Sequence, residues 1–377
     1  MIYLDNAATS FPRPEPVYAE MDRVNRNLSV NAGRGGYRAA REASAIIQNT
    51  KNAISRLFHC NGLADVVFTP SITQAMNQII NGFRVDCDTV IYISPYEHNA
   101  VARTVESVRN KTGCKICFLP LEEDSLRIDI KKMEYLFHEE RPDIVISTVI
   151  SNVTGYRLPV EKIFMKAREY GAITVADAAQ AAGLINIDYQ GFYADIIAFA
   201  GHKTLCGPLG IGGFIIRKGL VLDHTFTGGT GSDSLNPKMP EESPDRYEAA
   251  SENIVAIAGL NAALEWLREN PHEKKIQELT DYLVSELEEN DKITVLGING
   301  EQYHGIVSFI VDGYDSNDVG SILDDEFDIA VRTGFHCAPY IHKYLNDLTT
   351  AGTIRVGIGP FNTEQDIDEL IESLQSL

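Results

Sequence analysis

The stretch Ala198–Pro208 most constrains what this chain can become, because it places a lysine directly after a buried strand. The apolar run over residues 195–199 predicts a short strand with both faces covered. Open α/β sheets bind their ligands beyond the carboxyl ends of their strands. Lys203 therefore stands where its amine can form a Schiff base with an aldehyde.

A second buried strand, within residues 172–180, delivers Asp177 at its tip. Pyridoxal phosphate requires such a pair of side chains, because a lysine holds its aldehyde and an aspartate keeps its ring nitrogen protonated. Taken singly, each residue has an ordinary interpretation, as a solvated lysine or as an aspartate that caps a helix. The two strand ends together predict a pyridoxal phosphate site.

The chain as a whole predicts a two-part α/β protein. Strands alternate with helical patterns over about residues 60–220, which predicts a mainly parallel sheet with helices on both faces. Charged helices around residues 273–289 mark a change of composition, and residues 305–331 predict an α+β layer. We expect a large domain over residues 15–250 and a smaller α+β domain made of residues 1–14 and 251–377.

Several motifs resemble the cysteine desulfurase and selenocysteine lyase family, within the class V aminotransferase group of fold type I enzymes. They are Asp177-Ala-Ala-Gln180, Gly201-His202-Lys203 and Gly207-Pro208, and the resemblance extends from residues 4–9 to Arg355. It implies a fold type I enzyme that uses pyridoxal phosphate to convert L-cysteine to L-alanine, with the sulfur passed to an enzyme cysteine. A selenocysteine lyase or an aminotransferase acting on another small amino acid is the alternative.

The cofactor phosphate is expected at a helix that begins after the strand at residues 65–68. Exposed N–H groups and the positive end of the helix dipole attract anions there, so Ser71, Ile72 and Thr73 are the candidate contacts. A plain helix cap by Ser71 or Thr73 is the alternative. The family usually has threonine in place of Ile72 and serine in place of Ala200. These missing hydroxyls predict weaker cofactor binding, by about 0.5 to 1.5 kcal/mol per hydrogen bond.

The resemblance also assigns contacts residue by residue. For the cofactor, it implies His98 against the ring, Asn152 at the ring hydroxyl, Gln180, His202, and Thr230 reaching into the other subunit of a homodimer. For the substrate, it implies Asn6, Ala8, Asn152 and a bidentate Arg355. His98 and Lys203 are expected to move protons. Arg34, in a glycine-rich loop, is either an anion contact or a solvated surface residue.

Cys337 is the residue that separates sulfur transfer from the other reactions of this cofactor. It lies in a polar, glycine-containing loop, where we expect it to be exposed and where His336 would favour its thiolate. The segment Arg332–Ala338 resembles the desulfurase subgroup in which this cysteine takes the sulfur. An inert loop cysteine is the alternative interpretation.

Composition excludes several other classes of function. A net charge of −20 argues against nucleic acid or an acidic membrane as a partner. No run approaches the roughly 18 apolar residues of a membrane span and no leader pattern opens the chain, so we expect a cytoplasmic protein. The cysteines should be reduced, and Cys114 and Cys117 lack the further ligands of a metal site. We expect no metal, an amino acid as substrate, and a protein as sulfur acceptor.

Overall fold

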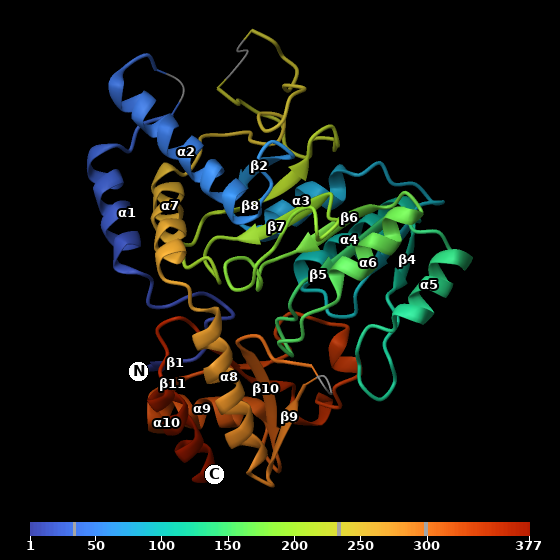
Figure 1. Cartoon of the computed structure of the whole chain (residues 1–377), viewed down its shortest axis with the longest axis vertical. Helices are drawn as coiled ribbons and strands as arrows, with labels where there is room; N and C mark the ends of the chain where they lie inside the picture. Colours follow the sequence, from blue (N-terminus) through green and yellow to red (C-terminus); the bar gives the residue numbers. More distant parts are fainter. Residues whose placement is uncertain (33–34, 232–234, 298–300) are drawn as a thin grey trace.

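The computed structural model describes residues 1–32, 35–231, 235–297 and 301–377. Figure 1 shows a larger half that carries the main sheet, and a smaller half in which both chain termini lie. None of the described helices is long and apolar enough to cross a membrane. Arg34 lies outside the described residues.

Within the described residues of the larger half, seven strands form one sheet. Their spatial order is β2 (Ala64–Thr69), β8 (Gly212–Arg217), β7 (Ile196–Ala200), β6 (Ile173–Asp177), β5 (Ile144–Thr148), β3 (Val90–Ile93) and β4 (Lys115–Phe118). The five strands from β7 to β4 pair in parallel, whereas β8 runs antiparallel to both its neighbours. Because β2 and β7 both oppose β8, their carboxyl ends lie at the same edge of the sheet.

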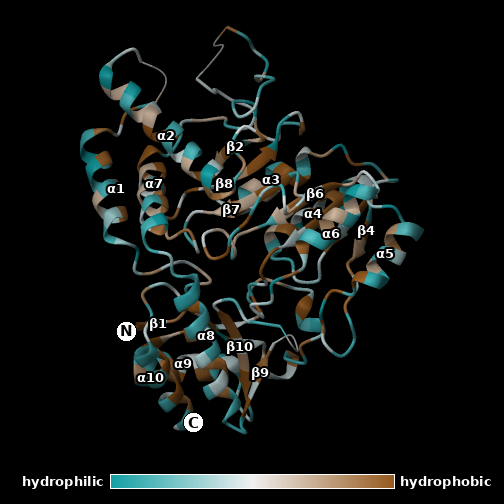
Figure 2. Ribbon diagram, viewed as in Figure 1, coloured by the Kyte–Doolittle hydropathy of each residue, from teal (hydrophilic) through white to brown (hydrophobic). Residues whose placement is uncertain are grey.

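Both faces of this sheet are buried, as the near-continuous apolar strands predict. On β7, Ile197 and Phe199 pack on one face, while Ile196 and Ala198 pack on the other. The first face is covered by α2 (Arg38–Leu57), α5 (Ile130–Glu139) and α6 (Val160–Glu169), and the second by α3 (Ile72–Gly82) and α4 (Asn99–Thr112). Figure 2 shows brown strands between helices that carry teal residues. The predicted mainly parallel sheet with helices on both faces is confirmed.

Helix α7 (Ile254–Glu269) packs against α1 (Glu15–Asn27) and α2, beside the larger half (Figure 1). Its largely apolar sequence suits this position, because Ile257, Leu260 and Ala263 are buried there. By its contacts α7 belongs to the larger half, although it follows the boundary expected at residue 250. The division of the chain into domains remains a prediction.

The smaller half has the α+β character that was predicted. Its antiparallel sheet has the order β12 (Arg332–Gly334), β13 (Thr353–Gly357), β10 (Ile306–Val311) and β9 (Ile293–Leu296). Helices α8 (Glu273–Glu288) and α9 (Ser316–Phe327) pack on this sheet, and α10 (Glu364–Gln375) packs on them. β1 (Ile2–Tyr3) pairs in parallel with β11 (Ile329–Ala330), which ties the N-terminus to this half. Two 3-10 turns, η1 (Ile341–Lys343) and η2 (Leu348–Thr350), precede β13.

Candidate functional site

The candidate site lies where several strands of the main sheet end at one edge. His98 follows β3, Asn152 follows β5, Asp177 closes β6, and Lys203 follows β7. Because these strands are parallel, their carboxyl ends bring the four side chains to one side of the sheet. Four residues predicted from separate motifs thus come together.

The loop that carries Lys203 is held by close backbone contacts. Gly201 donates its N–H to the carbonyl of Ile211 at 3.1 Å and accepts from the N–H of Gly207 at 2.8 Å. A Cβ on Gly201 would lie 2.7 Å from the carbonyl oxygen of Ile211, so the approach requires glycine. The loop turns Lys203 inward, where burial lowers the pKa of its amine to about 8. A lysine with this pKa is partly an uncharged nucleophile near neutral pH.

Asp177 is 3% exposed at the tip of β6. Its Oδ1 accepts the N–H of Ala179 at 2.9 Å, which leaves Oδ2 available to a second donor. Burial raises the pKa of this carboxyl, and the nearby Lys203 opposes the rise. A carboxylate aimed into a buried site suits a protonated ring nitrogen, which would pair its charge.

His98 caps helix α4 and stays uncharged. Its Nδ1 accepts the N–H of Ala100 at 3.0 Å, so the ring hydrogen is assigned to Nε2. Burial lowers the pKa of His98 to about 3, and Lys203 lowers it further. A neutral imidazole beside the reactive amine is suited to contact a ring and to transfer protons.

The predicted phosphate contacts lie at the start of α3. Ser71 caps this helix, and its side chain accepts the N–H of Gln74 at 3.3 Å. Gly212 on β8 faces the same point, where a Cβ would lie 3.1 Å from the nitrogen of Ile72. The missing side chain keeps the first N–H groups of the helix, at Ile72 and Thr73, within reach of an anion. Ile72 itself packs into the core, as does Ala200, so neither supplies the polar group that the family usually has there.

Three other predicted cofactor contacts use their side chains to join the segments around the site. Asn152 Nδ2 donates to the carbonyl of His336 at 2.7 Å, and Gln180 Nε2 donates to the carbonyl of Ala7 at 2.8 Å. His202 Nδ1 lies 3.2 Å from Thr9 Oγ1. The loops from the smaller half are therefore docked onto the strand ends of the larger half.

Cys337 is exposed, as predicted, on a loop of the smaller half. Its carbonyl accepts the N–H of Asn99 at 2.7 Å, one residue beyond His98. Its backbone is left-handed, with φ of 58° at Cys337 and 44° at His336, so the two residues project from a sharp turn. Arg332 Nη2 lies 3.4 Å from the sulfur and is the cation beside it.

The predicted part played by His336 is wrong. Its ring is 2% exposed, and Nε2 lies 2.7 Å from Thr353 Oγ1, within the core of the loop. Burial, followed by Arg355, lowers the pKa of His336 to about 2, so it carries no positive charge. A left-handed turn directs consecutive side chains apart, and sequence adjacency to Cys337 gave no sign of this.

Arg355 lies on β13, as predicted, and is 1% exposed. Nη2 donates to Oδ1 of Asp5 at 2.7 Å, and Nη1 donates to the carbonyl of Asn152 at 2.9 Å. Burial lowers the pKa of the guanidinium, and Asp5 opposes this effect. Asp5 and Arg332 were not predicted as site residues, although each begins or adjoins a motif that was quoted.

The remaining predicted residues are Asn6, Ala8 and Thr230. The side-chain Nδ2 of Asn6 donates to the carbonyl of Gly357 at 3.0 Å and to Asn362 Oδ1 at 3.1 Å. The backbone N–H of Ala8 donates to the carbonyl of Asp5. Asn6 thus holds its segment in place. Thr230 lines a hollow beside α2, and its contact with a partner subunit remains a prediction.

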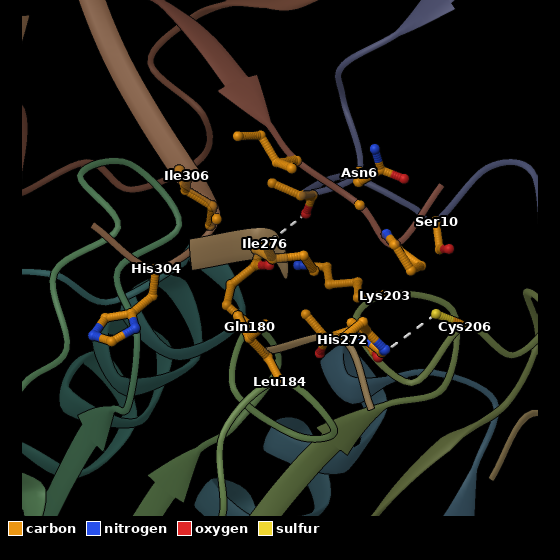
Figure 3. A pocket seen from close by; sticks show the side chains of 16 residues that line it. Asn6, Ser10, Gln180, Leu184, Lys203, Cys206, His272, Ile276, His304 and Ile306 are labelled. Atoms are coloured by element: carbon orange, nitrogen blue, oxygen red, sulfur yellow. Dashed lines mark hydrogen bonds between the residues drawn. The ribbon is translucent and has the colours of Figure 1, made fainter. Parts of the chain in front are cut away.

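Lys203 also borders a small cavity between the two halves of the protein (Figure 3). Its volume is about 30 Å³, which is room for one or two water molecules. Asn6, Ser10, Gln180 and His272 line it together with Lys203. A cavity of this size does not accommodate a six-membered ring.

These features fit a group with an aldehyde, a ring nitrogen and a phosphate. Lys203 can hold the aldehyde, Asp177 the ring nitrogen, and the open start of α3 the phosphate. Cys337 supplies a thiol that such a group does not itself require, and it stands at the rim of a groove of about 560 Å³ on the surface.

Comparison with known proteins finds similarity over the full chain. The family model for class-V aminotransferases matches residues 2–370. A probable cysteine desulfurase from Streptomyces coelicolor is 30% identical over 391 residues, covering 100% of this chain and 91% of the relative. Another from Halalkalibacterium halodurans is 31% identical over 385 residues, covering 100% of this chain and 92% of the relative.

Solved structures show the same similarity. The apo structure of a cysteine desulfurase from Thermococcus onnurineus NA1 has a TM-score of 0.90 and 28% identity, covering 100% of this chain and 95% of its own. The S-sulfonic acid form of a cysteine desulfurase from Escherichia coli has a TM-score of 0.84 and 25% identity, covering 100% and 94%.

Proposed function

Because the chain belongs to the class-V aminotransferase family that its motifs predicted, we propose that it is a pyridoxal phosphate-dependent cysteine desulfurase. Its relatives of that name match its whole length. The substrate is L-cysteine, the product is L-alanine, and the sulfur passes to Cys337 as a persulfide.

The single observation that carries this proposal is the placement of Cys337. Lys203 and Asp177 would serve an aminotransferase or a lyase equally well, so they do not identify the reaction. A second nucleophile is needed only when sulfur is transferred. Cys337 is an exposed thiol whose backbone bonds Asn99, next to His98, and whose sulfur lies beside the guanidinium of Arg332.

Each side chain has a role in holding the cofactor. Lys203 would bind the aldehyde, Asp177 the ring nitrogen, and Ser71, Ile72 and Thr73 the phosphate through the start of α3. His98 would lie against the ring, with Asn152, Gln180 and His202 around it. When bound, pyridoxal phosphate supplies an electron sink that weakens bonds at the α-carbon of the substrate.

Residues of this chain bind the substrate, take its sulfur and move the proton. Arg355 holds the α-carboxylate of L-cysteine through two hydrogen bonds. The thiolate of Cys337 attacks the sulfur of the substrate, and an S–S bond forms as the carbon–sulfur bond breaks. The electron pair of the broken bond stays on carbon, which takes a proton to give L-alanine. Lys203 and His98 are the groups placed to move that proton.

We further propose a cytoplasmic homodimer in which Thr230 completes the phosphate site of the partner subunit. The groove of about 560 Å³ next to Cys337 supports a protein acceptor for the sulfur, because it is open and its lining includes Phe335, Tyr340 and Leu348. A persulfide formed at its rim would be within reach of an acceptor thiol.

The substitution Cys337→Ser tests the proposal, and Cys87→Ser provides the matched control because Cys87 is exposed but lies outside the site. We expect Cys337→Ser to keep the absorbance of the bound cofactor and to bind L-cysteine, yet to form no protein persulfide and to lose most alanine production. Cys87→Ser should behave like the wild type. Cys337→Ser should lose less of its turnover of selenocysteine than of cysteine, because the carbon–selenium bond is weaker than the carbon–sulfur bond.

Two results together would exclude the proposal. They are full cysteine turnover by Cys337→Ser, and no persulfide detectable by mass spectrometry on the wild type. That outcome would favour a lyase or an aminotransferase.

A further inference from the structure

Asp5 and Arg355 form an ion pair that joins residues 350 positions apart in the sequence. Arg355 is 1% exposed and Asp5 is 20% exposed. Asp5 uses only Oδ1 and bonds only Nη2, and Nε of Arg355 is buried with no partner among the described residues. Leaving a buried guanidinium without any carboxylate is costly, so Asp5 is part of how Arg355 is held.

The backbone of Asp5 is held firmly at the same place. Asp5 bridges to Gly357, two residues beyond Arg355, and the N–H of Asn6 donates to the carbonyl of Gly357 at 3.1 Å. Farther along, the N–H of Ser10 donates to the carbonyl of His202 at 2.9 Å. Residues 5–10, which we term the N-terminal strap, therefore link β13 to the lysine loop. These backbone hydrogen bonds therefore fix the position from which the Asp5 side chain extends.

The single contact from Asp5 leaves several donors of the guanidinium without a partner among the described residues. A carboxylate binds arginine best through two parallel hydrogen bonds. Nε has no partner, and Nη1 and Nη2 each keep one hydrogen beyond those given to Asn152 and Asp5. Nε has almost no accessible surface, so the two Nη groups, each with one hydrogen left, are the donors that a ligand carboxylate would use.

The local charges allow a second carboxylate beside Asp5. Arg332 and Lys203 lie close enough to act on the ionisation of neighbouring groups in the site, as does Asp5. Positive charge therefore remains for a substrate after Asp5 has paired with Arg355. A positioning role for Asp5 is compatible with binding of an amino acid.

We propose that Asp5 is the positioning residue of the substrate-carboxylate site. It holds Arg355 by Nη2, so that the guanidinium is fixed in orientation for the α-carboxylate of the amino acid. This inference rests on the proposed function for the identity of the substrate, but it concerns binding of the carboxylate and not the fate of the sulfur.

Two substitutions separate orientation from charge. Asp5→Ala removes both the acceptor and the charge, whereas Asp5→Asn keeps an oxygen that can accept from Nη2. We expect Asp5→Ala to raise KM for L-cysteine by about 10- to 100-fold, the range for a lost charge-assisted hydrogen bond. kcat and the cofactor absorbance should stay near wild-type values. Tm should fall in Asp5→Ala, because the buried guanidinium loses its carboxylate, and Asp5→Asn should show smaller changes in both KM and Tm. Asp328→Asn is the control, because Asp328 forms an exposed ion pair with the N-terminal amine.

A double-mutant cycle tests whether Asp5 acts through Arg355. We expect Arg355→Ala to raise KM for L-cysteine steeply while the bound cofactor keeps its spectrum. Adding Asp5→Ala to that variant should raise KM no further. Equal or lower KM in both Asp5 variants would overturn the inference. So would additive losses in the cycle, or a loss of bound cofactor and of kcat in parallel with the rise in KM, which would indicate a structural role only.

Binding of L-alanine, measured by titration of the loaded enzyme, separates this inference from the proposed function. It reports on the carboxylate site without any sulfur chemistry. If the wild type made no alanine from L-cysteine but Asp5→Ala still weakened L-alanine binding, the proposed function would fail while the inference stood. If the wild type turned over L-cysteine and Asp5→Ala bound L-alanine normally, the inference would fail alone.

Discussion

Glu97→Gln should make the stability of this protein less sensitive to pH. Glu97 is fully buried between β3 and α4, where Oε1 accepts Ser94 Oγ at 2.5 Å and the N–H of Thr148 at 2.6 Å. Its Oε2 has no partner among the described residues. Burial, followed by the charge of Asp177, raises the pKa of Glu97 to about 8.

The sign and size of the effect follow from that pKa. The unfolded chain releases the proton of Glu97 near pH 4.5, whereas the folded protein keeps it until about pH 8. The contribution of Glu97 to stability is therefore fully present below about pH 4.5 and is lost as the pH rises to about 8. At 1.36 kcal/mol per unit, the loss reaches about 4 kcal/mol. Glutamine does not titrate, and its amide oxygen can still accept the bonds of Ser94 and Thr148.

Urea unfolding at several pH values between 5 and 8 measures this difference. Wild type and variant need equal cofactor content, because bound cofactor stabilises the folded state. We expect the free energy of unfolding of Glu97→Gln, relative to wild type, to rise by up to about 4 kcal/mol across this range. The amide group itself changes the free energy of unfolding by a constant amount that does not depend on pH, so it does not affect the change of the difference between pH 5 and pH 8. The exposed Glu278→Gln is the control. Parallel pH profiles of Glu97→Gln and wild type would refute the reasoning.

Two further predictions concern the cofactor and the assembly. The wild type should be yellow, and borohydride should fix the cofactor to Lys203, whereas Lys203→Ala should retain none after reduction because only a primary amine can form the bond. Peptide mapping that found the cofactor on another lysine would contradict this site. The protein should sediment as a homodimer, and Thr230→Ala should weaken cofactor binding with a dimer still formed. A fully loaded and active monomer would be incompatible with that prediction.

Much of the large half could be predicted from the sequence because its signals are local. Buried parallel strands are short apolar runs, and the residue after each run lies at the ligand edge of the sheet. Lys203 and Asp177 were found in this way, as was the helix start at Ser71, whereas His98 was assigned from the family resemblance. Each depends on residues within a few positions along the chain.

The contacts that complete the site depend on packing between distant segments. Asp5 meets Arg355 across 350 positions, and Cys337 meets Asn99 across the junction of the two halves. No periodicity or spacing encodes which of these segments become neighbours. His336 shows most directly what the sequence could not predict, because it precedes the exposed Cys337 yet lies buried against Thr353.

The sequence by itself determined the strand ends, the helix caps and the chemistry of the residues at them, because those follow from local composition and backbone geometry. Only the tertiary structure decided which groups become neighbours: Asp5 for Arg355, and Arg332 instead of His336 for the sulfur of Cys337. The physical reason is that burial and pairing set the charge state of a side chain, and both arise only when the two halves pack together.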